Sequence, residues 1–118
     1  MSYNINTWKT KKLENFSIEL DAFYEMDECE VVLGKGGYIK VTGPSEGFEV
    51  TGKLVGDRVL VHSIESWGEG SGWAMEAMKV LLAHSTGTLL ATLVWEGGDS
   101  IERLTVIDGV VTEVEADI

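Results

Sequence analysis

Alternation of apolar and polar residues runs through most of the chain and predicts a fold rich in β-strands. Residues 16–20 place apolar side chains at every second position, which is typical of a strand with one buried face. Residues 22–24 either continue this strand past a bulge or begin a turn. Residues 31–33 and 38–42 flank a glycine-rich turn and predict a hairpin.

A second hairpin is predicted over residues 48–65, because Gly56 and Asp57 form a two-residue turn with glycine first. A regular register from this turn pairs Leu54 with Val59, Gly52 with Val61, Val50 with Ser63 and Phe48 with Glu65. Phe48, Val50, Leu54, Val59 and Val61 then share a core face. The same parity turns Glu65 and Trp67 toward the core, while Arg58 and His62 face solvent.

One helix is expected at residues 72–84, with Ser71 as its N-cap. Its polar positions are Glu76 and Lys79, and apolar side chains cover most of the remaining arc. An ordinary surface helix has a narrower apolar stripe. We therefore expect this helix to be covered on more than one side, either by a sheet that curves around it or by a second copy of the chain.

The C-terminal third predicts further strands. Residues 89–95 are apolar on both faces, as expected of a central strand. Asp108 and Gly109 form a type I′ turn signal, which pairs Thr105 with Thr112 and Arg103 with Val114. The prediction is a single α+β domain over residues 1–118, with a polar N-terminal segment at 1–12. It has a mostly antiparallel, curved sheet of about seven strands packed on the single helix, in an order that the sequence leaves open.

The net charge of the chain restricts the possible binding partners more than its amino-acid composition does. The chain has 118 residues and a net charge of −11. This charge opposes binding to nucleic-acid phosphates and to anionic membranes, and it favours a basic protein partner. The single cysteine, Cys29, excludes an intrachain disulfide, and its neighbours Glu28 and Glu30 are expected to raise the pKa of its thiol. The chain shows no signal-peptide pattern or membrane-span pattern, so a cytoplasmic location is expected.

Two glycine-rich loops carry the densest candidate chemistry. The strand that ends at Glu65, the returning helix and the strand at 89–95 should bring the loops at 65–73 and 95–99 to one end of the domain. Tryptophan faces attract cations and stack on sugars, and paired carboxylates act in glycoside hydrolysis or bind divalent cations. The alternative is that these residues only form turns and core. The candidate ligand-binding residues are Glu65, Trp67, Glu69, Ser71, Trp73, Trp95, Glu96 and Asp99.

Exposed carboxylates supply a second kind of candidate site, a surface for a basic protein. One predicted surface is an acidic run and the other is the last strand. Their residues are Glu25, Asp27, Glu28 and Glu30 in the run, and Glu113 and Glu115 on the strand.

A non-enzymatic interaction protein of the inhibitor, immunity or accessory kind is therefore the favoured function. The alternative is a small-molecule binder or a hydrolase at the tryptophan loops, and a homodimer formed through the helix or the last strand is a third hypothesis. No cofactor is expected. One cysteine and two separated histidines, His62 and His84, lack the spacing of a zinc site.

Overall fold

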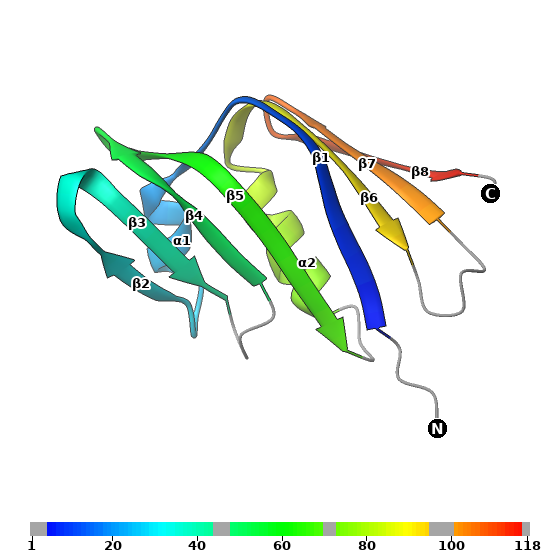
Figure 1. Ribbon diagram of the computed structural model, residues 1–118, viewed down its shortest axis with the longest axis horizontal. Coiled ribbons are helices and arrows are strands. Elements are labelled where there is room, and N and C mark those ends of the chain that lie inside the picture. The colour runs from blue at the N-terminus through cyan, green and yellow to red at the C-terminus, as the bar shows by residue number, and fades with distance from the viewer. Residues whose placement is uncertain (1–4, 44–47, 70–72, 95–100, 117–118) are drawn as a thin grey trace.

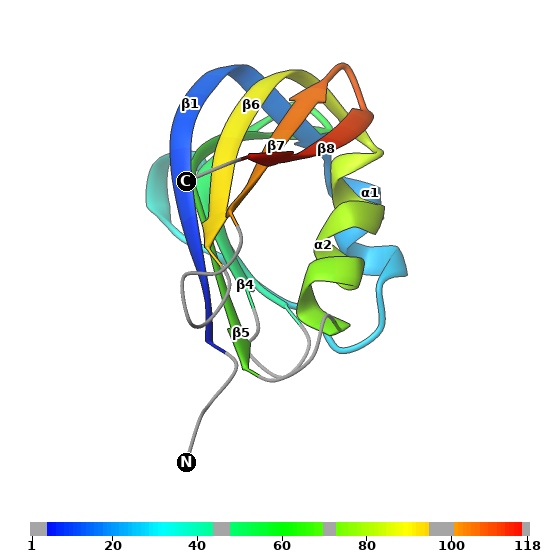
Figure 2. The same cartoon turned by 90° about the vertical axis from the view of Figure 1, so that its right-hand side faces the viewer.

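The computed structural model describes residues 5–43, 48–69, 73–94 and 101–116, which form an open antiparallel sheet curled around two short helices (Figures 1 and 2). The strands follow one another across the sheet in the order β2-β3-β4-β5-β1-β6-β7-β8. The prediction of a mostly antiparallel sheet is confirmed, but the described residues form eight strands and two short helices where about seven strands and a single helix were predicted. The elements are β1 Ile5–Glu19, α1 Leu20–Glu25, β2 Glu30–Leu33, a 3₁₀ turn Lys35–Gly37, β3 Tyr38–Thr42, β4 Phe48–Val55, β5 Arg58–Glu69, α2 Trp73–Leu82, β6 Ser85–Val94, β7 Ile101–Ile107 and β8 Val110–Ala116.

β1 is the central strand, since it pairs with β5 on one side and with β6 on the other. Much of the polar segment predicted at 1–12 belongs to this strand. Its inward positions Trp8 and Leu13 pack against the core, while Lys9 and Lys11 are exposed. Register shifts interrupt both of its ladders, and Asn15 has a φ of 48°. These irregularities hide the strand from a strict period-2 pattern.

α1 is a helix that the alternation pattern did not predict. It covers the segment expected to be strand or turn, and it buries Ala22 and Phe23. A helix of six residues is too short to be stable alone, and its N-cap makes no side-chain hydrogen bond. Burial of Phe23 in the core therefore stabilises it, not its own helix propensity.

α2 lies on the concave side of the sheet (Figure 2). It begins and ends within the range predicted for the helix and buries Met78, Leu81 and Leu82. It contacts β5 and β8, which belong to opposite halves of the sheet. Of the two covers proposed for this apolar helix, the curved sheet is the one observed, although Val80 stays exposed.

The β4–β5 hairpin follows the predicted register only near its turn. Gly56 has a φ of 62°, and the pairs Leu54–Val59 and Gly52–Val61 form as expected. A β-bulge follows, so that Thr51 pairs with Ser63. One extra residue in a strand reverses which face each later side chain occupies.

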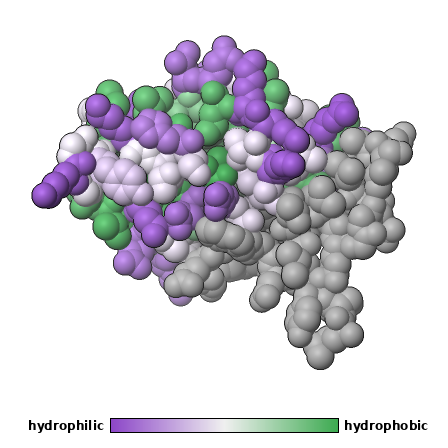
Figure 3. Space-filling view, in the orientation of Figure 1, coloured by the Kyte–Doolittle hydropathy of each residue, from purple (hydrophilic) through white to green (hydrophobic). Residues whose placement is uncertain are grey.

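This reversal corrects the prediction for Glu65. Glu65 pairs with Glu49 and is exposed, while Ile64 and Ser66 are buried. The expectation that Glu65 faces the core is therefore wrong. Figure 3 shows the outer face of the sheet, where hydrophilic residues surround smaller hydrophobic patches.

The C-terminal hairpin confirms the predicted register. Asp108 and Gly109 have φ values of 46° and 85°, as a type I′ turn requires, and Thr105 pairs with Thr112. Arg103 lies on the outer face and is exposed. β6 is central, as predicted, but only its inner face is fully buried; Leu90 on its outer face is half-buried.

Candidate functional site

The strand ends that precede the two tryptophan loops lie at the same end of the sheet. Thr7 of β1 pairs with Trp67 of β5 on one side and with Val94 of β6 on the other. Because neighbouring strands are about 4.8 Å apart, the backbones at 67 and 94 are separated by about 10 Å. The ends of β5 and β6 therefore lie on either side of the same residue of β1.

Most of the predicted ligand-binding residues cannot be placed more finely than this. Ser71, Trp95, Glu96 and Asp99 lie outside the described residues. For Trp67, Glu69 and Trp73 the structure describes only the backbone, in β5 and at the start of α2. Glu65, the remaining member, is exposed on the outer face beside Glu49, whose Oε2 is 3.7 Å from Lys40 Nζ.

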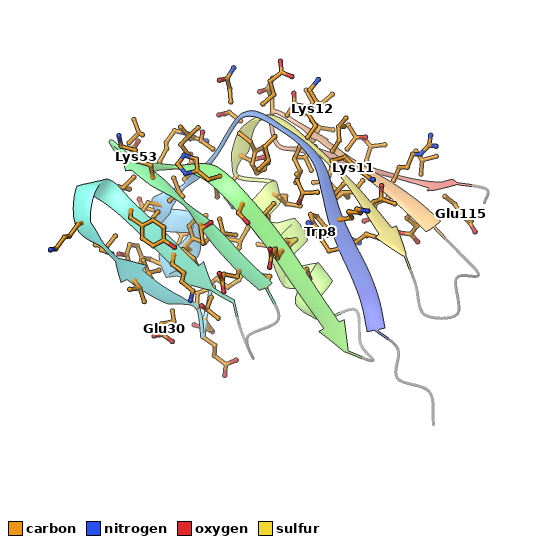
Figure 4. The ribbon with its side chains drawn as sticks, viewed as in Figure 1. Trp8, Lys11, Lys12, Glu30, Lys53 and Glu115 are labelled. Atoms are coloured by element: carbon orange, nitrogen blue, oxygen red, sulfur yellow. The ribbon has the colours of Figure 1, made fainter. Side chains whose placement is uncertain are left out.

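Trp8 lies at the same end of the sheet and was not among the candidate ligand residues (Figure 4). Its Nε1 donates a hydrogen bond to Thr10 Oγ1 at 2.8 Å, and Thr10 Oγ1 donates to the Ile64 carbonyl at 2.9 Å. No ladder pairs join β1 to β5 between Thr7 and Ser17. The bond from Thr10 to Ile64 links the two strands where the ladder is interrupted, and Trp8, on the same strand as Thr10, orients the Thr10 hydroxyl. The only sequence signal for this role is an aromatic residue inside a polar segment.

The acidic loop, which we define as residues 25–30, joins α1 to β2. Its carboxylates Glu25, Asp27, Glu28 and Glu30 are exposed. Met26 and Cys29 alternate with them and pack against the core. The backbone is thus held in place by two inward side chains while the carboxylates face solvent.

The charges of the acidic loop are uncompensated within the described residues. None of its four carboxylates takes part in the ion pairs seen there. The last turn of α1 also contains no basic residue, although Glu25 ends that helix. Carboxylates at a helix C-terminus meet the negative end of the helix dipole, which is unfavourable.

The predicted surface on the last strand differs from the acidic loop. Glu113 forms an ion pair with Lys79 of α2. Glu115 lies directly opposite Glu102 on the neighbouring strand. Glu30 on β2 and Glu115 on β8 occupy opposite edges of the sheet (Figure 4). The two predicted partner surfaces are therefore separate sites.

A polar cluster around Arg58 was missed by sequence reasoning, which placed this side chain on a solvent face. Arg58 Nε donates to Ser17 Oγ at 2.8 Å, and Nη2 donates to the Ser17 carbonyl at 3.2 Å. Arg58 Nη1 also lies 3.8 Å from Glu19 Oε1, and Ser17 Oγ is 3.0 Å from Thr86 Oγ1. These bonds tie β5, β1 and β6 together, so the guanidinium serves the fold.

The remaining candidate chemistry is weak. Burial raises the pKa of the Cys29 thiol, which keeps it protonated and unreactive; the predicted direction is confirmed, and desolvation is its cause. Across the described ranges, no three His, Cys, Asp or Glu side chains are arranged to hold a metal ion. Neither described helix is long and apolar enough to cross a bilayer.

No protein-family model, curated protein or solved structure matches the chain.

Proposed function

We propose that the protein is a non-enzymatic binding module, of the inhibitor, immunity or accessory kind, that binds a basic protein through the acidic loop. The observation that carries the proposal is the absence of any ion pair for Glu25, Asp27, Glu28 and Glu30 in the described part of the chain. Four like charges on one short connection repel one another. Lysine and arginine side chains of a partner would relieve that repulsion.

The loop is also well suited to binding without rearrangement. Met26 and Cys29 pack against the core, so the backbone of the loop needs little ordering when a partner binds. Binding sites that are already ordered lose less conformational entropy on association.

Exposed apolar residues flank the acidic loop on both sides. Tyr24 precedes it with 59% of its surface exposed, and Val32 and Leu33 follow it with 48% and 59% exposed. Protein interfaces commonly combine a few aromatic or aliphatic anchors with a charged rim. This combination favours a protein partner over a small cation.

The acidic loop is preferred to the last strand because Glu113 already has a cationic partner in Lys79. A basic protein that binds Glu113 would have to compete with this ion pair.

Binding to a partner captured from a native lysate tests the proposal when it is measured with matched variants. The test variant changes Glu25, Glu28 and Glu30 to Gln and Asp27 to Asn. The control variant removes as many charges elsewhere, by changing Glu14, Glu65 and Glu102 to Gln and Asp21 to Asn, all of which are exposed or half-buried. We expect the test variant to bind at least about tenfold more weakly, mainly through a slower association rate, and the control to bind nearly normally.

Salt supplies the second criterion. At about 1 M salt, where the Debye length is about 3 Å, the difference between test variant and wild type should largely vanish. If both variants weaken binding equally, only the net charge matters and the loop is not the site. If no basic protein is captured, or if binding ignores salt, the proposed function is wrong.

A second candidate function is the binding of a small molecule at the ends of β5 and β6. It is favoured by one observation, the pairing of Thr7 with both Trp67 and Val94. Under this hypothesis, Trp67→Ala with Glu69→Gln abolishes a ligand-induced rise in melting temperature. Tyr38→Ala with Glu30→Gln, an aromatic and a carboxylate at the far edge of the sheet, should leave that rise intact. A ligand library that produces no rise in the wild type would count against this candidate.

A further inference from the structure

β8 is an edge strand with an apolar outer face. Val110 and Val114 are 66% and 56% exposed, and Ile107, the neighbour of Val110 on β7, is 51% exposed. Edge strands usually carry charged side chains or bulges that prevent pairing with another chain. On β8 the charged residues Glu113 and Glu115 lie on the inner face, where Glu113 is paired with Lys79, and the described side chains of the outer face are Val110, Thr112 and Val114.

The turn geometry shows which backbone groups of β8 are available. A two-residue type I′ turn makes Ile107 and Val110 a hydrogen-bonded pair, and hydrogen-bonded pairs then recur at every second residue. Val110, Thr112 and Val114 therefore direct their N–H and C=O groups toward β7. Val111 and Glu113 direct theirs toward the open edge, together with Glu115.

We propose that two copies of the chain associate through this edge, with β8 of one copy antiparallel to β8 of the other and the twofold axis at Thr112. The outer face is self-complementary about that residue. Val110 of each copy faces Val114 of the other, and Thr112 faces its own counterpart. On the inner face Glu113 lies opposite Val111, so no carboxylate faces another, and these two residues supply the hydrogen-bonded pairs.

Neighbouring registers are less favourable. The backbone pattern allows the strands to slide only by an even number of residues, because hydrogen-bonding positions must face each other. A shift by two residues in one direction places Glu113 of one copy opposite Glu113 of the other, so that two carboxylates face and repel each other. The other shift places Glu113 and Val114 opposite the Asp108–Gly109 turn and shortens the paired region. The Thr112 register alone combines a long paired region with separated carboxylates.

Charge gives the dimer a signature that differs from partner binding. Each copy has a net charge of −11, so two copies repel each other at long range. Added salt screens this repulsion and should strengthen the dimer, whereas it should weaken binding of a basic protein. The salt dependence therefore allows the dimer and the proposed function to be tested separately.

Cross-linking tests the axis directly. In a Cys29→Ser background, Thr112→Cys should form a disulfide-linked dimer after mild oxidation, since residues at a non-hydrogen-bonded pair have Cα atoms about 4.5 Å apart. Thr105→Cys is the matched control, because Thr105 faces Thr112 from the next strand inward. Its two copies would be about 14 Å apart and should not cross-link. Cross-linking of both variants to the same extent would indicate random collision and overturn the proposal.

Charge swapping tests the register without oxidation. Thr112→Lys and Thr112→Glu should each weaken self-association by about fivefold, because like charges then oppose each other at the axis. Mixing the two should restore a heterodimer roughly tenfold tighter than either homodimer. Sedimentation equilibrium of the wild type over a range of salt is the independent measurement. A monomer at all salt concentrations, or a dimer unaffected by changes at Thr112, would overturn the proposal.

Discussion

Replacing Arg58 by Ala removes the side chain that joins three strands of the sheet. Arg58 donates two hydrogen bonds to Ser17, at 2.8 and 3.2 Å, and its side chain is only 29% exposed. A hydrogen bond that involves a charged group contributes about 1.5–3 kcal/mol when it is well buried. Allowing for partial exposure and for the entropy of ordering the side chain, we expect Arg58→Ala to lower the free energy of unfolding by about 2–3 kcal/mol.

Urea denaturation, followed by tryptophan fluorescence and circular dichroism, measures this loss. With an m value of about 1.5 kcal/mol/M, the midpoint should fall by about 1.3–2 M. Arg103→Ala is the matched control, since Arg103 is exposed and makes no ion pair seen in the described part of the chain. It should change the free energy of unfolding by no more than about 0.5 kcal/mol.

Two further measurements separate hydrogen bonding from charge at Arg58. Arg58→Lys keeps the charge but loses the planar fork of donors, so it should recover less than half of the lost stability. The effect of Arg58→Ala should also persist at about 1 M salt, where an exposed ion pair with Glu19 would be screened. Equal losses for Arg58→Ala and Arg103→Ala, or a loss that salt abolishes, would refute the reasoning.

Three other predictions follow from packing, pairing and burial. Gly52→Ala should destabilise the protein by about 2 kcal/mol or more, because the added Cβ would lie 2.0 Å from the Leu60 carbonyl oxygen; Lys53→Ala, at an exposed position beside it, should cost less than about 0.5 kcal/mol in the same urea assay. Glu115→Lys should raise the free energy of unfolding by about 0.5 kcal/mol, and with it the melting temperature, because a lysine then faces Glu102. Glu113→Lys should lower the melting temperature, because the new lysine lies beside Lys79. Cys29 should react slowly with a thiol reagent until urea unfolds the chain, and rapid labelling of the folded protein at neutral pH would contradict its burial. Because folding raises the pKa of this thiol, its contribution to stability is complete below the ordinary thiol pKa. That contribution is lost as the pH rises through the raised pKa of the folded state.

Local chemistry accounts for the features that the sequence predicted correctly. The turns at Gly56–Asp57 and Asp108–Gly109 depend on residues that tolerate positive φ, and the pairing next to each turn follows from the turn itself. The prediction failed where one strand departs from regular geometry. The bulge lies at His62, between the pairs Gly52–Val61 and Thr51–Ser63, and it turns Glu65 outward. Its one trace in the sequence is Ile64, which breaks the alternation set by Val59 and Val61, and a regular register from the turn overlooks it.

Non-local contacts account for the rest. Ser17 and Thr86 come to Arg58 from strands that are remote in the chain, so nothing near Arg58 in the sequence indicates the cluster. α1 is helical because Phe23 is buried by the folded sheet. The acidic loop was easier to find, because an exposed run of carboxylates needs no distant residue to define it.

The central place of β1 bears on how the chain reaches its native state. This strand is synthesised before the other strands of the sheet, and its partners β5 and β6 come well after it in the chain. Loops that long must close before either ladder can form, which is typical of slowly folding β-proteins. During translation both edges of β1 stay unpaired until β5 has left the ribosome, and one edge stays unpaired until β6 follows. Deletion of the chain from β6 onward should therefore yield an aggregating fragment, not a smaller folded domain.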